Sequence, residues 1–115
     1  MAIQSVYCLC AAWCDTCTAF RGAFDEAAAA HSTLRFEWID IEDEADLVDD
    51  VDIETFPTIL ALDEAGGVAF CGPIRPQRGH LDTVIASPGG GPQPAAIVAL
   101  GARLARRELD QAGAR

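Results

Sequence analysis

Cys14 and Cys17, separated by two residues, are the pair whose spacing in this sequence best suits chemistry. They stand at the predicted start of a helix, where residues three apart share one face and lie close enough for a disulfide. The partial positive charge of a helix N-terminus also stabilises a thiolate at Cys14. A thiolate with a second thiol in reach is the minimum requirement for thiol–disulfide exchange. Zinc sites use the same spacing, so a structural zinc half-site is the alternative.

Hydrophobic periodicity predicts the elements that position this pair. Residues 3–10 are uncharged and rich in β-branched and aromatic side chains, which is typical of a buried strand. Phe20, Phe24 and Ala27 recur at helical spacing and predict a helix over residues 14–30. Further strands are predicted over 34–41, 58–62 and 68–71, and short helices over 44–51 and 76–86. The glycine-rich turn between the last two strands favours an antiparallel hairpin.

Pro57 opens the strand at 58–62, a position in which a strand tolerates proline. Trp13, Cys14 and Cys17, then Pro57-Thr58, then Gly72 fifteen residues after the proline, together resemble the thioredoxin family over roughly residues 3–86. The resemblance implies an α/β fold with three layers and a mixed central sheet. The predicted order of elements, strand–helix–strand, short helix, strand–strand–helix, matches the reduced core of that fold.

The resemblance also implies roles for the residues of the motif. Cys14 is then the nucleophile, and Cys17, one turn inside the helix and partly buried, is the resolving thiol that releases the substrate. Trp13 covers the motif. Asp15 and Thr16 depart from the Gly-Pro that is usual in reducing thioredoxins. The Asp15 carboxylate opposes a thiolate at Cys14, although it favours the start of the helix.

The proline segment is the second place where the resemblance assigns a role. A cis Pro57 puts Phe56 and its backbone opposite the two cysteines, where an extended substrate segment pairs, and keeps metal ions away from them. The alternative is an ordinary trans proline that begins the strand. Gly72 is expected beside the active site, which would bring Cys71 close to Cys14. Packing at the end of a strand is the other interpretation of Cys71.

Cys8 is the largest departure from the family. Thioredoxins bury an aspartate six residues before the nucleophile, whereas this chain has a thiol there, a much weaker acid. Cys8 and Cys10 point to the same side of their strand. With Cys14 and Cys17 they make four potential thiolate ligands for zinc or copper. The alternatives are that Cys8 and Cys10 fill the core as small apolar residues, or that one of them has a redox role.

Composition limits the partners of this chain. The sequence has 115 residues, enough for one domain, and a formal net charge of −10. Ten of its eighteen acidic residues lie between positions 37 and 54. This balance argues against nucleic acids and anionic membranes as partners. The acidic segment is either a solvated face or a docking surface for a basic partner.

Residues 87–94 have the glycine and proline content of a linker, and residues 95–115 predict an arginine-rich amphipathic helix. We therefore expect a domain over 1–86, a linker, and a C-terminal helix. This helix either packs back on the domain, meeting the acidic segment, or pairs with a second copy, or binds a partner.

The expected function is thiol–disulfide exchange on protein disulfides through Cys14 and Cys17, with an external reductase or thiol donor and no bound cofactor. Five cysteines, no basic leader over residues 1–12 and no long apolar run favour a cytosolic location. Two alternatives stay open. One is a metal-binding module that uses Cys8, Cys10, Cys14 and Cys17. The other is a non-catalytic docking domain.

Overall fold

The computed structural model describes residues 2–48, 51, 53, 55–89 and 91–113. Within them, helices and strands follow one another in the predicted order. The elements are β1 (Ile3–Cys10), α1 (Asp15–Ala30), β2 (Arg35–Asp40), α2 (Ala45–Val48), β3 (Thr58–Asp63), β4 (Val68–Pro73), α3 (Arg78–Ala86) and α4 (Ala95–Gly113). The acidic residues 49, 50, 52 and 54 lie outside the described part of the chain.

The four strands form one mixed sheet in the order β2–β1–β3–β4. β1 pairs with β2 in parallel, whereas β1–β3 and β3–β4 are antiparallel. The parallel pair is connected by α1, because parallel neighbours need a crossover. Gly66, with φ +84°, makes the tight turn of the β3–β4 hairpin. The α/β fold with a mixed central sheet that was expected is confirmed.

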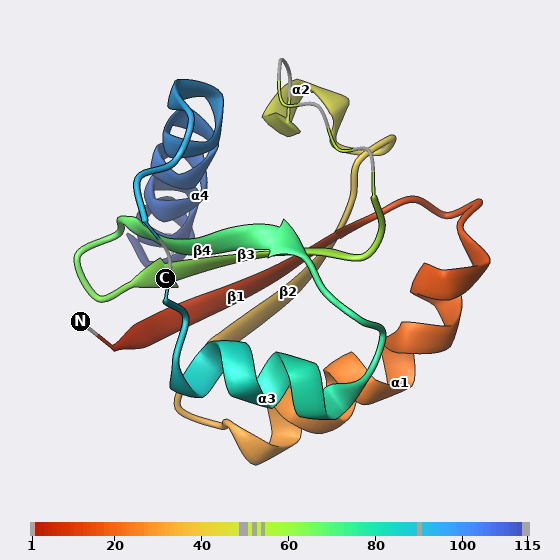
Figure 1. Cartoon of the computed structure of the whole chain (residues 1–115). Helices are drawn as coiled ribbons and strands as arrows, with labels where there is room; N and C mark the ends of the chain where they lie inside the picture. Colours follow the sequence, from red (N-terminus) through yellow and green to blue (C-terminus); the bar gives the residue numbers. More distant parts are fainter. Residues whose placement is uncertain (1, 49–50, 52, 54, 90, 114–115) are drawn as a thin grey trace.

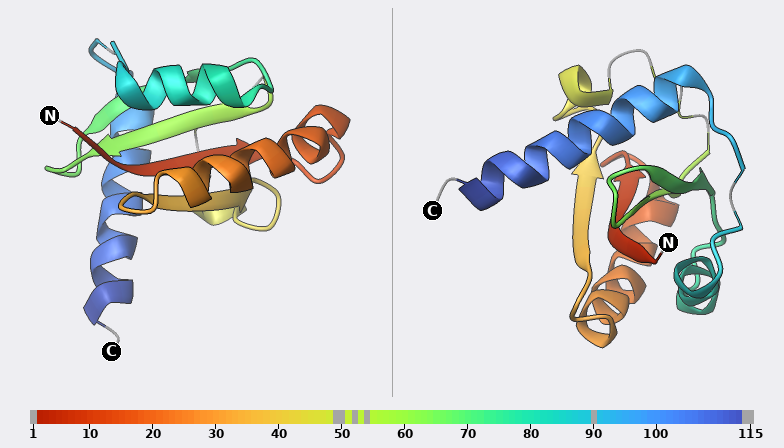
Figure 2. Two further views of the ribbon diagram at one scale, coloured as in Figure 1. Left: turned by 90° about the horizontal axis from the view of Figure 1, so that it is seen from below. Right: turned by 90° about the vertical axis from the view of Figure 1, so that its left-hand side faces the viewer.

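Helices cover both faces of the sheet and complete three layers. α1 and α3 lie together on one face, whereas α4 crosses the other face (Figure 1). α2 contacts the middle of α4, where Arg103 donates a hydrogen bond to the Leu47 carbonyl. The views along two further directions show the same separation (Figure 2). None of the described helices is both long and apolar enough to cross a bilayer.

Side-chain alternation along β1 divides the core into two clusters. Val6, Cys8 and Cys10 point towards α1 and α3, whereas Tyr7 and Leu9 point towards α4. The first cluster also takes aromatic side chains from α1, and the second takes Leu100 and Leu104 from α4, both fully buried. Each face of β1 therefore has its own core.

The C-terminal helix packs back on the domain, which was one of the three predicted alternatives. Gly101 allows α4 to approach β4 closely, because a Cβ at this position would collide with Val68. Arg107 of α4 pairs with Glu37 and, at 2.8 Å, with Glu44. The basic face of α4 therefore meets the described part of the acidic segment.

A buried polar group lies beneath α4 as well. Tyr7, only 1% exposed, donates a hydrogen bond from its hydroxyl group to the carboxylate of Glu108. The same carboxylate accepts a hydrogen bond from Ser5 Oγ at 2.9 Å. Burial and the nearby carboxylate raise the pKa of Tyr7. These bonds satisfy the hydroxyl groups of Ser5 and Tyr7 beneath α4.

Candidate active site

Cys14 is the N-cap residue of α1, with extended backbone angles of φ −89° and ψ 111°. Its carbonyl accepts the first bond of the helix from the Thr18 amide at 3.2 Å. Its side chain is a free thiol, partly exposed, and it packs against the edge of the first core cluster. The thiol therefore stands at the N-terminus of α1, where another molecule can reach it.

Cys17 lies within the first turn of α1 and faces the sheet, where it is 1% exposed. Its sulfur is bonded to Cys10, at the end of β1, with the two Cα atoms 5.9 Å apart. The partner predicted for Cys17 was Cys14, and in this structure it is Cys10. The sequence spacing identified a thiol one turn away but not the second sulfur beneath the helix.

Cys8 is completely buried next to this disulfide. Its sulfur lies 3.4 Å from the sulfur of Cys10. Burial raises the pKa of the Cys8 thiol to about 12, and the positive charge of Arg21 opposes this only partly. Cys8 therefore remains a neutral thiol over the physiological range, at the position where the family resemblance places an acid.

The proline segment packs close to the cysteine motif. The peptide bond between Phe56 and Pro57 is cis, and Pro57 is buried. Phe56 contacts the same core cluster as Cys14, and its ring meets Trp13 edge to face with centroids 5.5 Å apart. Trp13 is 66% exposed, so the two rings form an apolar shoulder beside Cys14 rather than a closed cover.

The remaining predicted residues take supporting positions. Asp15 begins α1 and Thr16 follows it, both exposed. Thr58 is buried and donates its hydroxyl to the carbonyl of Thr55 at 2.6 Å, which ties the proline segment to the start of β3. Gly72 pairs with Ile59 in the β3–β4 ladder. The hydrogen bond of Thr58 and the pairing of Gly72 with Ile59 hold the end of the sheet beside the proline segment.

The structure decides between the two interpretations of Cys71. It does not lie near Cys14 but packs in the α4 cluster, on the other face of the sheet, as the alternative of packing in the strand predicted. Successive side chains of a strand point to opposite faces, so Cys71 faces away when Phe70 faces the first cluster. There it lines a groove with Pro94 and Ile97, and burial raises its pKa to about 11. Cys71 belongs to the groove and not to the thiol site.

A metal site is not formed by the cysteines in this state. Of its four candidate ligands, Cys10 and Cys17 are bonded to each other. Within the described part of the chain, no three cysteine, histidine or acidic side chains gather as ligands.

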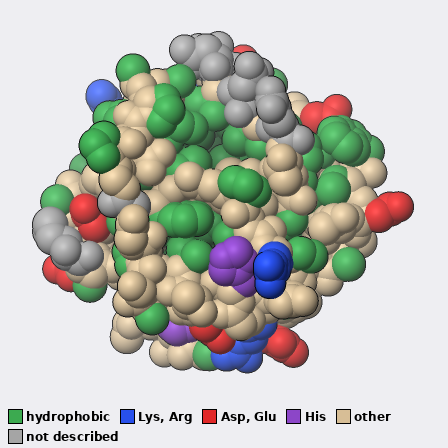
Figure 3. All heavy atoms as spheres, viewed as in Figure 1, with side chains coloured by type: hydrophobic (Ala, Val, Ile, Leu, Met, Phe, Trp, Pro, Cys, Tyr) green, Lys and Arg blue, Asp and Glu red, His purple; other side chains and the backbone are tan. Residues whose placement is uncertain are grey.

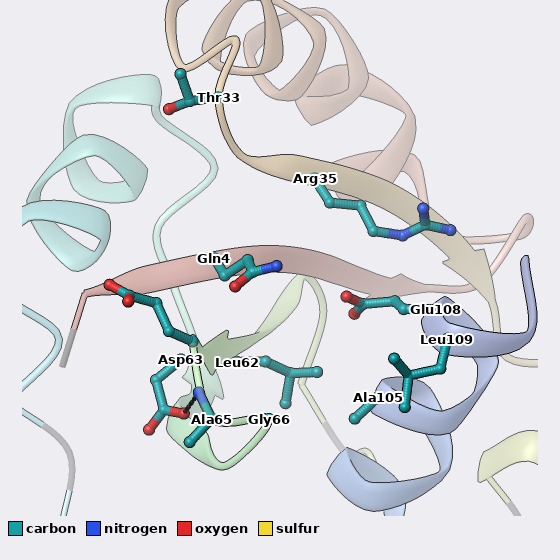
Figure 4. Close-up of a pocket in the computed structure, with 11 residues that line it drawn as sticks. Gln4, Thr33, Arg35, Leu62, Asp63, Ala65, Gly66, Ala105, Glu108 and Leu109 are labelled. Atoms are coloured by element: carbon teal, nitrogen blue, oxygen red, sulfur yellow. Dashed lines mark hydrogen bonds between the residues drawn. The ribbon is translucent and has the colours of Figure 1, made fainter. Parts of the chain in front are cut away.

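A pocket of about 450 Å³ lies away from the cysteines, between α4, the β3–β4 turn and the ends of β1 and β2 that are near Gln4 and Arg35. In Figure 4 the side chains of Gln4, Arg35 and Glu108 border one common space. None of the five cysteines lines it. The chemistry of the thiols is therefore separate from this pocket.

On the face that carries β4, apolar side chains gather at the centre, whereas acidic ones stand at the margin (Figure 3).

Comparison with known proteins assigns the family. The family model for thioredoxin matches residues 4–82, more than half of the chain. The chain belongs to the thioredoxin family. Members of this family in general act as oxidoreductases on protein disulfides, which agrees with the free thiol and adjacent disulfide of this thioredoxin-family protein. Among curated protein sequences, no significant match is found.

Solved structures show the same fold at low sequence identity. Mitochondrial thioredoxin 3 from Saccharomyces cerevisiae, in its oxidised form, is 19% identical, with a TM-score of 0.64 over 75% of this chain and 79% of that chain. The germline-specific thioredoxin Deadhead (Thioredoxin-1) from Drosophila melanogaster is 17% identical, with a TM-score of 0.63 over 74% and 79%. A malarial protein, also 17% identical, has a TM-score of 0.63 over 75% and 96%.

Cys10 is the site residue whose partner sequence reasoning missed. It was considered as core filling, as a metal ligand or as a redox residue, without a partner being chosen. One signal was available: Cys10 ends a strand on the face that the following helix covers, and Cys17 is on the buried side of that helix. A sulfur at the end of such a strand and one in the first turn of the next helix converge.

Proposed function

We propose that this thioredoxin-family protein exchanges protein disulfides through Cys14 as nucleophile and Cys17 as resolving thiol. The observation that carries the proposal is the position of Cys14, a free and partly exposed thiol at the N-terminus of α1, with Cys17 in the first turn beneath it. A thiolate is favoured at such a position. We place the activity in the cytoplasm, where thiols are kept reduced.

The reaction begins with the fully reduced protein. The Cys14 thiolate attacks one sulfur of a substrate disulfide, the other substrate sulfur leaves as a thiolate, and a mixed disulfide forms. The Cys17 thiolate then attacks the Cys14 sulfur and expels the second substrate sulfur. The substrate gains two electrons and two protons, and the protein holds one disulfide. An external thiol donor or reductase supplies two electrons to restore the dithiol.

The shoulder made by Trp13 and Phe56 supports a protein segment as substrate. It is apolar and borders Cys14, so a peptide side chain can cover it as the thiolate meets the disulfide. The peptide bonds around Pro57 offer polar groups to an extended chain, as the family resemblance implies. Apolar contact holds the substrate, and backbone pairing aligns it.

The test is reduction of the insulin disulfides with a dithiol donor in excess, followed by turbidity. We expect Cys14→Ser to reduce the rate to the level of the donor alone. Cys17→Ser should accumulate a mixed disulfide at Cys14, which mass spectrometry detects as one substrate chain added. Cys71→Ser is the matched control, because Cys71 lies on the other face, and it should keep the rate of the unmodified chain. A Cys14→Ser protein that still reduces insulin would refute the assignment.

A further inference from the structure

We propose that Cys10 is a second resolving cysteine, which transfers the disulfide of the oxidised protein from Cys14–Cys17 to Cys10–Cys17 and returns Cys14 to the surface as a free thiolate. The inference rests on the proposed function, which forms the Cys14–Cys17 disulfide first. It adds an internal step after substrate release, carried out by a sulfur that the substrate never touches.

Cys17 is placed to serve both disulfides. The structure joins it to Cys10, and it lies in the first turn of α1, three residues after Cys14, the N-cap residue. Exchange between disulfides requires an attacking thiolate, a central sulfur and a leaving sulfur. Cys10, Cys17 and Cys14 supply these three in order, from the core to the surface. The central sulfur stays with Cys17 in both states.

Burial favours the inner disulfide. Cys10 and Cys17 are each 1% exposed, whereas Cys14 is partly exposed at the helix N-terminus. A disulfide carries no charge and loses little when it leaves water, whereas an ionised sulfur loses much. The arrangement found here puts the uncharged disulfide in the core and leaves the ionisable sulfur at the surface. The reverse arrangement would bury a free thiol at Cys10 and place one sulfur of the disulfide at the partly exposed position of Cys14.

Cys8 assists the step as a hydrogen-bond donor. Its sulfur is 3.4 Å from that of Cys10, and its thiol keeps its proton because burial holds its pKa at about 12. An S–H group at this distance stabilises negative charge on Cys10 while that sulfur attacks, or while it leaves in the reverse direction. Cys8 itself forms no bond to another sulfur in the cycle.

The step is balanced without an added oxidant or reductant. Cys10 loses its proton to solvent and attacks the Cys17 sulfur, the Cys17–Cys14 bond breaks, and Cys14 leaves as a thiolate. One sulfur–sulfur bond forms and one breaks, so the oxidation state of the protein does not change. Reduction runs the sequence backwards: Cys14 attacks Cys17, Cys10 leaves, and the donor then reduces the outer disulfide. The buried disulfide is in this way reduced through Cys14.

Alkylation of the oxidised protein tests this step. The Cys71→Ser chain is used throughout, so that Cys14 is the only partly exposed cysteine among the described residues. After oxidation with one equivalent of diamide, iodoacetamide incorporation at Cys14 is followed by mass spectrometry. We expect Cys14 to react readily, and to react at least tenfold more slowly when Cys10→Ala is added, because its sulfur then stays in the outer disulfide. Equal protection of Cys14 in both chains would overturn the proposal.

A control and a second measurement keep the result clear. Val6→Ala, equally buried on the same face of β1, should leave Cys14 reactive; if it protects Cys14, the role assigned to Cys10 is wrong. In the oxidised Cys71→Ser chain, digestion after Trp13 and before Asp15 should link the fragment containing Cys10 to that containing Cys17 and leave Cys14 unlinked. An oxidised chain in which Cys17 is linked to Cys14 and not to Cys10 would also overturn the proposal.

These outcomes are separate from those of the insulin assay. Insulin reduction that depends on Cys14, with no link between Cys10 and Cys17, removes the inner step and leaves the proposed function in place. An inner disulfide in a chain that never reduces insulin removes the proposed function and, with it, the role of Cys10 as a resolving residue.

Discussion

The two faces of the sheet are built from the same strands but are held by different chemistry. On the α1 face, Cys8, Cys10 and Cys17 bring three sulfur atoms together among aromatic side chains, and Cys10 and Cys17 form a disulfide. On the α4 face, leucine packing and buried hydrogen bonds to Glu108 fix the helix in place. Side-chain alternation in β1 separates these functions, so chemistry and stability should respond to different substitutions.

The largest expected effect comes from removing packing on the α4 face. Leu104 is completely buried between α4 and the sheet. Leu104→Ala should lower the free energy of unfolding by about 2–5 kcal/mol, because it leaves a cavity. Urea denaturation measures this. Leu109→Ala is the control on the same helix, because Leu109 is 74% exposed, and should change stability by less than about 0.5 kcal/mol.

The same substitution should also show that the faces are separate. At temperatures where Leu104→Ala remains folded, its rate of insulin reduction per molecule should match that of the unmodified chain. A large fall in that rate would mean that α4 packing supports the thiol site across the sheet.

A second prediction places one glycine substitution on each face. Gly101→Ala should destabilise by about 1–3 kcal/mol, because the added methyl group collides with Val68. Gly22→Ala, within α1, should instead stabilise by about 0.5–1 kcal/mol, since no heavy atom lies within 4 Å of the new methyl group. Thermal and urea unfolding give both signs. A double-mutant cycle with Val68→Ala should recover part of the Gly101→Ala cost; independent effects would contradict the close contact.

The third prediction concerns alkaline pH and the α1 face. The pKa of Cys8 is about 12 in the folded chain, against 9.0 for an ordinary thiol. Above pH 9 this thiol ionises in the unfolded chain but stays neutral in the folded chain. Its contribution to the free energy of unfolding is therefore fully present below pH 9 and is lost as the pH rises towards 12. Between pH 8 and 10.5, the unmodified chain should lose about 2 kcal/mol more than Cys8→Ala. Urea unfolding of both oxidised proteins at the two pH values tests this; equal losses would contradict it.

The smallest expected effect is electrostatic and belongs to the α4 face. Arg107 pairs with Glu37 and Glu44 at the partly exposed edge of α4. Arg107→Ala should cost about 0.5–1 kcal/mol at low salt, and less in 1 M NaCl, where charges are screened. Arg106→Ala, at the exposed neighbouring position, is the control. A cost for Arg107→Ala that does not change with salt would assign its role to packing of the side-chain stem.

Local patterns were enough to predict the elements of this chain. The uncharged segment before the motif, the apolar stripe of α1 and the glycine turn after Asp63 each depend on neighbours in sequence. Cys8 and Cys10 were also placed correctly on one side of β1, because strand alternation is a local property. The order of these elements, with the cysteine motif and Pro57, was enough to predict the thioredoxin fold.

Three features were decided only when the elements packed together. Cys17 bonds to Cys10, Cys71 faces α4, and α4 packs on the sheet. The bond between Cys17 and Cys10 depends on how far α1 lies above the end of β1. The orientation of Cys71 depends on a register shift near Leu62 that sets the orientation of β4. The third depends on contacts between residues far apart in sequence, such as Gly101 with Val68. Sequence determines which side of an element is apolar, but only the packed structure determines which partner covers it, because that choice is made by shape and distance in three dimensions.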